Sequence, residues 1–414
     1  MSSNSNRPLG LDDDVQETAD LTASSPQHVP RPRLLAIDGL RALAVVMVFS
    51  CHSWAASHSP HLEITIAGHR IWLGSMFGTF PAAVDLFMVL SGFCLFWPLC
   101  VQRGSVEKWS WREYARRRIH RIVPPYYVAI VVISLLYNAL IFRRFLMHEP
   151  VVWAPLPSLW QYATHFLFIH TLFKDTWSGI QGAFWSLGLE AQFYVAFPFV
   201  VFAYRKFGIL VAGGMIAISI VYRIIVGLVT LNSPGTDQFL PSIFFLGRWM
   251  EFAAGMISAW VVAKQVLAGS RYSAAYGLVG IVGALVLYVL AAYPVPGLWR
   301  IVPSRELLLA ASFGLLTTAL CASQTKIRLL FENRPVVWLG TISYSVYLIH
   351  QEAVYRISDH VRFSMHISNV DRMGLLLTLG FAVVVCLSFA FYTCFEKPFL
   401  NKRTEPVARE ADIL

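Results

Sequence analysis

Long apolar blocks alternate with short polar segments along most of the chain. Each block holds roughly 18 to 24 residues, enough for a helix to cross a hydrocarbon core of about 30 Å. We therefore expect an all-α polytopic membrane protein with about ten transmembrane helices. The pattern predicts them at 34–55, 78–99, 122–142, 184–203, 207–230, 240–263, 272–292, 304–324, 335–356 and 371–395.

A shorter apolar segment lies at 157–173 and contains His165 and His170. It is too short to span a membrane comfortably. Counting it as a crossing would also reverse the charge bias of every later loop. We expect this segment to lie on the outer face of the membrane or partly within it.

The composition agrees with a chain that is mostly buried in lipid. Of the 414 residues, 56% are apolar and 14% are charged, whereas about a quarter of the residues of a soluble protein are charged. This excludes a water-soluble enzyme, a disordered chain and a disulfide-stapled secreted domain. We expect a flexible cytoplasmic tail at 1–33, a membrane domain at 34–398 and a second cytoplasmic tail at 399–414.

The formal charge of +9 is a signal of topology rather than of nucleic-acid binding. With the N-terminus inside, the inner segments hold 21 of the 33 Lys and Arg residues and the outer segments hold 9. The positive-inside rule therefore predicts that both termini are cytoplasmic. The expected location is the plasma (inner) membrane, with the lipid bilayer as a partner and no nucleic acid.

Arg41 and His52 share the first predicted span. Eleven helical residues turn through three full turns plus about 20° and rise about 16 Å, so both side chains project from one stripe. A cation at the inner mouth and an imidazole further out can address two ends of one long ligand. Alternatively, Arg41 snorkels to a lipid phosphate and His52 bonds a neighbouring helix.

Other ionisable groups inside the spans need partners, because each costs at least 2 to 3 kcal/mol in lipid (an order-of-magnitude figure). Arg248 and Glu251 are three residues apart and fit a mutually neutralising pair. Asp85 and Glu190 have no local cation, and either carboxylate is a candidate to orient His52. The six cysteines have no metal-site spacing and fit buried apolar positions, so no metal is expected.

A basic segment at 101–121 mixes Arg117, Arg118 and Arg121 with aromatic residues. It fits an amphipathic helix on anionic lipid. It equally fits an anion site for a phosphorylated cosubstrate, because guanidinium groups grip phosphates through paired hydrogen bonds.

The ordered motifs of the chain resemble those of the acyltransferase-3 family of membrane-bound acyltransferases. They are IDGLRALAVVMVFSCH with Arg41 and His52, VDLFMVLSGF at 84–93, RRRIHRIVPPYY at 116–127, FWSLGLEAQFY at 184–194, RWMEFAAG at 248–255, ISYSVYLIH at 342–350 and FEKPF at 395–399. Many relatives have a second acidic residue where this chain has Ala191. No fused C-terminal hydrolase-like domain is expected, because the chain ends 16 residues after Pro398.

The resemblance implies transfer of an acyl group, most often acetyl, from acyl-CoA to a hydroxyl of a carbohydrate or related acceptor. Arg117, Arg118 and Arg121 would hold the nucleotide end of the donor, with Arg41 near the pyrophosphate. His52 would act as general base or take up the acyl group covalently, and both roles use neutral imidazole. Ser186, Tyr194, Tyr344 and His350 would contact the substrate, with Ser186 or Tyr344 as an oxyanion donor.

A proton-coupled transporter or channel is the competing hypothesis, because proton relays also leave His, Asp and Glu within membrane helices. The chain has no inverted repeat and no paired Gly/Pro-broken helices to support it. The acceptor, the acyl chain and the oligomeric state are not encoded in any motif that we identify.

Overall fold

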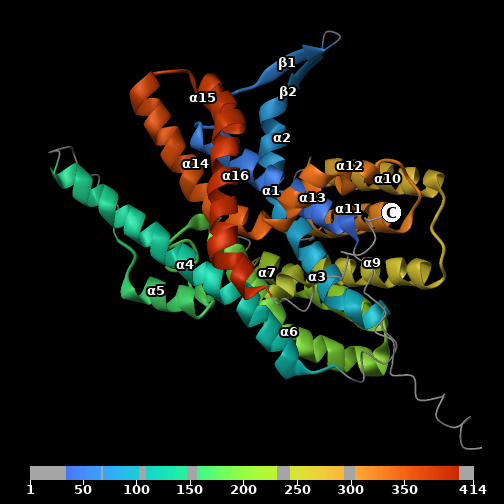
Figure 1. The fold of residues 1–414 in the computed structure, drawn as a ribbon. Coiled ribbons are helices and arrows are strands. Elements are labelled where there is room, and N and C mark those ends of the chain that lie inside the picture. The colour runs from blue at the N-terminus through green and yellow to red at the C-terminus, as the bar shows by residue number, and fades with distance from the viewer. Residues whose placement is uncertain are drawn as a thin grey trace, which may run out of the picture. The chain divides into compact units, whose positions relative to one another are not determined.

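The computed structural model describes residues 34–66, 69–101, 109–146, 156–230, 243–292 and 304–400, and these are almost entirely helical (Figure 1). The predicted tail at 1–33 lies outside the described residues, and so do residues 401–414 of the tail predicted at 399–414.

Nine helical stretches in the described part of the chain are long and apolar enough to cross a membrane. Each overlaps one of the predicted spans, so the all-α polytopic architecture is confirmed. The corresponding elements are α1 (Leu35–Ala56), α3 (Ala83–Val101), α4 (Trp111–Leu146), α6 (Trp185–Phe207), α7 (Leu210–Val229), α9 (Trp249–Leu267), α10 (Ala274–Ala292), α11 (Ser304–Ala322) and a last stretch of α15 (Asn369–Leu375) and α16 (Phe381–Phe391).

The helix predicted at 335–356 is not continuous, and its predicted end was wrong. It is divided into α13 (Arg334–Thr341) and α14 (Ser343–Met365). Four charged residues between positions 352 and 362 lower the hydropathy of α14, and it is not among the nine stretches. They are Glu352, Arg356, Asp359 and Arg362.

Although it is less apolar, the α13–α14 pair runs alongside α1 in the same direction. A Cβ atom on Gly340 would lie 1.8 Å from the Asp38 carbonyl oxygen, so the two backbones touch there. Further along, the hydroxyl of Ser358 donates a hydrogen bond to the carbonyl oxygen of Ala56 at 2.7 Å. The end of α13 thus lies near the start of α1, and α14 reaches the end of α1.

The segment predicted on the outer face folds as the short helix α5 (Leu159–Phe166) and one 3-10 turn (His170–Leu172). A capping box starts α5: Ser158 accepts from the backbone N–H of Gln161, whose side chain accepts from that of Ser158. This segment is not among the nine stretches that can cross a membrane, in agreement with the prediction that it is too short to span one.

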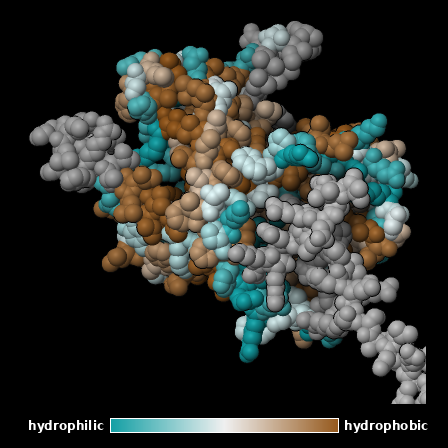
Figure 2. Space-filling view, viewed as in Figure 1, coloured by the Kyte–Doolittle hydropathy of each residue, from teal (hydrophilic) through white to brown (hydrophobic). Residues whose placement is uncertain are grey.

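Small residues bring the central helices α3 and α9 together. A Cβ atom on Gly92 would lie 2.1 Å from the Phe252 carbonyl oxygen, and one on Gly255 would lie 1.9 Å from that of Val89. Close backbone approach through glycine is a typical way for membrane helices to pack. Elsewhere, apolar side chains cover much of the surface, including the region of α14 and α16 in Figure 2.

Two further elements were not predicted. A short antiparallel hairpin of β1 (Glu63–Ile66) and β2 (His69–Trp72) follows α1, and α2 (Leu73–Thr79) follows the hairpin. In addition, α4 begins at Trp111, so part of the basic segment and the predicted span at 122–142 form one continuous helix. Its arginines therefore stand on the first turns of a membrane helix.

Candidate active site

Five helices, α1, α3, α4, α6 and α14, surround one cavity inside the helical domain. It contains about 790 Å³ of atom-free space, counting the part that is open to the surroundings. Several of the predicted site residues line it, namely Arg41, Arg118, Arg121, Ser186, Glu190, Tyr194 and Tyr344. The fold therefore gathers residues that are as far apart in the sequence as Arg41 and Tyr344 into one site.

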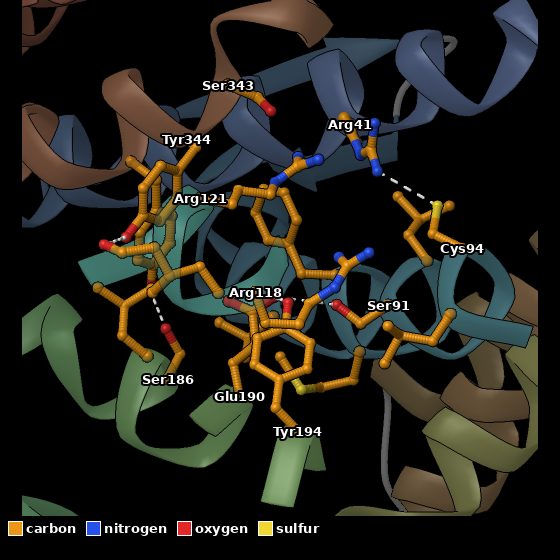
Figure 3. A pocket seen from close by; sticks show the side chains of 18 residues that line it. Arg41, Ser91, Cys94, Arg118, Arg121, Ser186, Glu190, Tyr194, Ser343 and Tyr344 are labelled. Carbon is orange, nitrogen blue, oxygen red and sulfur yellow. Dashed lines mark hydrogen bonds between the residues drawn. The ribbon is translucent and has the colours of Figure 1, made fainter. Parts of the chain in front are cut away.

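Three guanidinium groups reach this cavity (Figure 3). Arg41 is held by Asp38, one turn earlier, through Nη1 at 3.0 Å, and by the sulfur of Cys94 through Nη2 at 3.2 Å. Arg118 lies over the rings of Tyr114 and Tyr194, at 5.9 and 5.8 Å from their centroids. The buried Nε of Arg118 has no hydrogen-bond partner among the described residues. An orphaned donor beside two further cations fits an anionic ligand.

Arg117, the third arginine predicted for the cosubstrate, does not line the cavity. It forms an ion pair with Glu113 one turn earlier, and both side chains are exposed. The local i, i+4 partner explains why its guanidinium stays at the surface of α4.

Glu190 is the carboxylate in this cavity. Its Oε1 accepts hydrogen bonds from the hydroxyl of Ser91, at 3.3 Å, and from the hydroxyl of Tyr194. Ser91 comes from α3 and Tyr194 from the next turn of α6. Glu190 is thereby fixed against α3, and Arg118 lies over the ring of the same Tyr194 that bonds it.

The hydroxyl groups proposed as oxyanion donors already have partners. Ser186 Oγ lies 2.5 Å from the hydroxyl of Tyr347, which also donates to the carbonyl oxygen of Ala183 at 2.8 Å. The hydroxyl of Tyr344 donates to the carbonyl oxygen of Ile122 at 3.0 Å. Either group must exchange one of these bonds before it can stabilise an oxyanion.

His52 stands outside the cavity and is partly exposed. Its ring lies beside that of His350, with the centroids 5.1 Å apart. His350 is buried; its Nδ1 is 2.8 Å from the carbonyl oxygen of Tyr347, and its Nε2 has no partner among the described residues. Donation from Nδ1–H leaves Nε2 as an acceptor near His52.

A row of aromatic rings separates the cavity from His52. Phe87 and Tyr347 line the cavity and meet edge to face at 5.7 Å. The ring of Tyr347 lies 5.4 Å from that of His350, which in turn is the neighbour of His52. Arg41 and His52, on one stripe of α1, therefore face opposite sides of this wall.

Neither candidate carboxylate is hydrogen bonded to His52 in the part of the chain that the structure describes. Asp85 instead forms a buried ion pair with Arg248, which also binds Glu251 at 3.1 Å. The predicted Arg248–Glu251 pair is thus confirmed, and Asp85 joins it from α3. Nearby, Arg223 on α7 pairs with Glu306 on α11 at 2.6 Å.

Sequence reasoning missed four residues that shape this site: Asp38, Ser91, Cys94 and Tyr347. Asp38 was detectable, because it lies three residues before Arg41 inside the first predicted span. Ser91, Cys94 and Tyr347 are uncharged, and no spacing rule links them to Arg41, Glu190 or Ser186. Among the described residues, no group of three or more His, Cys, Asp or Glu side chains is arranged to hold a metal ion.

The chain is similar to known acyltransferases. It is 26% identical over 397 residues to the peptidoglycan O-acetyltransferase OatA of Listeria monocytogenes, a match that covers 89% of this chain and 56% of that protein. It is also 26% identical over 408 residues to the acyltransferase MdmB of Streptomyces mycarofaciens, covering 92% of this chain and 95% of that protein. The chain thus spans little more than half the length of the first relative.

No solved structure matches the chain. The acyltransferase-3 family model, described as an acyltransferase domain, matches residues 34–393, which include the complete cavity and His52. This range is far more than half of the sequence. The chain is an integral multi-pass membrane protein, and it belongs to the acyltransferase-3 family.

Proposed function

We propose that this protein is a membrane O-acyltransferase that moves an acyl group, most often acetyl, from acyl-CoA to a hydroxyl of a carbohydrate or related acceptor. The observation that carries the proposal is the convergence of Arg41, Arg118 and Arg121 on one cavity of an acyltransferase-family membrane domain. The name of one relative, a peptidoglycan O-acetyltransferase, supports a cell-surface glycan as the acceptor class.

The three arginines bind the phosphate groups of the donor in this proposal. Clustered guanidinium groups suit phosphates, because each offers several N–H donors in a planar fork. Arg118 contributes the free Nε donor. Glu190 accepts hydrogen bonds from Ser91 and Tyr194, and its negative charge offsets part of the positive charge of the three arginines.

His52 carries the proton transfer. As a general base, it removes the proton of the acceptor hydroxyl while the oxygen attacks the thioester carbonyl; the carbon–sulfur bond breaks, and the thiolate leaves and recovers the proton. As a nucleophile, its ring nitrogen first attacks the thioester carbonyl, and the carbon–sulfur bond breaks to release the thiolate. The acceptor hydroxyl then attacks the acyl-imidazole; the carbon–nitrogen bond breaks, and the hydroxyl proton passes to the thiolate. Both routes need neutral imidazole, and the acceptor nitrogen of His350 is suited to orient the His52 ring.

The aromatic wall gives the two substrates separate entrances. The donor enters from the arginine side, and the acceptor reaches the partly exposed His52 from the other side. The thioester meets His52 when Tyr347 swings aside and releases its bonds to Ser186 and Ala183. By the basic-residue bias, the donor side is cytoplasmic and the acceptor side is the outer face of the plasma membrane.

The test uses the full chain in lipid vesicles with labelled acetyl-CoA and purified peptidoglycan fragments. We expect labelled fragments from the wild type, none from His52→Ala, and a raised apparent KM for acetyl-CoA from Arg41→Ala. His360→Gln is the matched control, because His360 is exposed on α14. Normal transfer by a correctly inserted His52→Ala protein contradicts the mechanism. Passage of label across the membrane without transfer to any acceptor favours a transporter.

A further inference from the structure

A second cavity forms an open groove between α6 and α7, with about 1710 Å³ of atom-free space, counting its open side. Its walls are almost wholly apolar. Two side chains carry polar groups. The indole N–H of Trp249 is buried and has no hydrogen-bond partner among the described residues. The amide group of Gln192 is already used: Nε2 donates to Thr171 Oγ1 at 2.7 Å, and Oε1 accepts from the backbone N–H of Phe245 at 3.1 Å. The groove therefore offers a ligand mainly hydrocarbon contact.

The groove follows one stripe of α6. The lining positions recur at intervals of three and four residues, the spacing of one helix face, from Ala191 to Phe207. They are Gln192, Val195, Ala196, Phe199, Val200 and Ala203. A helical run of this length rises about 24 Å, most of a hydrocarbon core of about 30 Å.

The opposite wall of the groove is formed by α7, whose side chains do not fill the groove at Gly214. Gly214 lines the groove, and a Cβ atom built on it would have no other heavy atom within 4 Å. Both helices are among the nine stretches that can cross a membrane, so the medium around the groove is hydrocarbon rather than water. An unfilled groove would lose dispersion contacts along its whole length. Lipid chains are the material available to fill it.

One end of the groove carries positive charge. Lys206 continues the α6 stripe three residues after Ala203 and is exposed. Its Nζ lies 5.2 Å from the centroid of the Phe207 ring, and Phe207 lines the groove. Lysine at the end of a membrane helix places its ammonium group at headgroup level, where it attracts anionic lipids.

We propose that the α6–α7 groove is a binding site for one anionic glycerophospholipid, with an acyl chain along the groove and the phosphate group at Lys206. The ligand class follows from the apolar length of the groove, its membrane surroundings and the cation on its stripe. The site lies on the side of α6 away from Glu190 and Tyr194, so it is separate from the proposed active site.

The test places the purified full chain in vesicles that contain phosphatidylglycerol or phosphatidylcholine with a photoactivatable acyl chain. Trypsin cleavage after Lys206 and Arg223 releases 207–223, the peptide that carries the α7 wall. We expect phosphatidylglycerol to label this peptide about fivefold more than phosphatidylcholine does. Gly214→Leu should abolish the labelling, because its side chain fills the groove.

Gly213→Leu is the matched control. Gly213 is on the same helix and also has open space around it, but it does not line the groove. Lys206→Gln should remove the preference for phosphatidylglycerol while labelling persists. Equal labelling of the two glycine variants, or equal labelling by both lipids in the wild type, overturns the proposal. A change of oligomeric state in Gly214→Leu alone also overturns it, because the groove would then hold a second copy of the chain.

Discussion

At the residue scale, His165 and His170 form an isolated neutral pair. Their rings stack with centroids 4.0 Å apart, and both side chains are fully buried. Each ring has one nitrogen near a backbone carbonyl oxygen: His165 Nδ1 is 2.8 Å from that of Gln161, and His170 Nε2 is 2.9 Å from that of Phe184. Burial, with a smaller contribution from the neighbouring His170 ring, lowers the pKa of His165 to about 3, and burial lowers the pKa of His170 to about 4.

Acid should therefore destabilise the protein through this pair. Both folded pKa values lie below the ordinary value of 6.5, so the unfolded chain takes up protons first. Stability is complete above pH 6.5 and falls as the pH drops toward 4; at pH 5 the loss is about 2 kcal/mol per ring. The thermal unfolding midpoint between pH 7.5 and 5 measures this. His165→Gln with His170→Gln should flatten the curve, whereas His360→Gln should leave it unchanged. An equally steep decline in the double variant contradicts the prediction.

At the element scale, the sequence predicted helices better than it predicted their contacts. Membrane crossing demands length and apolarity, and both are local properties, so nine predicted spans agree with helices. Glu352 and Arg356 lower the hydropathy of α14, so its predicted span ended too early, at 356. In the hairpin, β1 alternates polar and apolar residues over four positions only, the shortest run that indicates a strand. Charge inside the predicted spans identified Arg41 and Glu190 as site residues. It did not predict the ion pair between Asp85 and Arg248, because that pair depends on how the helices pack rather than on spacing along the chain.

Helix packing makes a sharp prediction at Gly255. A Cβ atom there would lie 1.9 Å from the carbonyl oxygen of Val89, which is backbone and has little room to move. Gly255→Ala should force α9 away from α3 and cost about 3 kcal/mol, the upper range for overpacking. The measurement is the thermal unfolding midpoint in detergent. Gly213→Ala is the control; it has free space and should keep or slightly raise the midpoint, since alanine favours helix. Equal midpoints for the two variants would refute the close-packing argument.

At the scale of the whole molecule, the direction of α14 constrains the number of crossings. Seven of the nine candidate spans lie between α1 and α13 in the sequence. After α1 and these seven, the chain is back on its starting side, so α13–α14 must begin where α1 begins. The contacts of Gly340 with Asp38 and of Ser358 with Ala56 have this parallel arrangement. Had 157–173 crossed the membrane, α14 would run antiparallel to α1.

This argument predicts that both termini lie on the same side of the membrane, with α13–α14 as the ninth crossing and the last stretch as the tenth. In sealed vesicles, protease should reach N-terminal and C-terminal tags together or spare both. Introduced cysteines extend the test. Lys326→Cys, between α11 and the short helix α12 (Arg328–Glu332), should react with an impermeant maleimide from the side of the tags. Asp175→Cys, after α5, should react from the opposite side; both positions are exposed. Tags on opposite sides, with both cysteines reacting from the sides predicted, would mean that α14 does not cross. Asp175→Cys reacting from the side of the N-terminal tag, with Lys326→Cys reacting from the opposite side, would instead give the segment at 157–173 a full crossing. The donor and acceptor sides assigned above would then have to be exchanged for every helix after it.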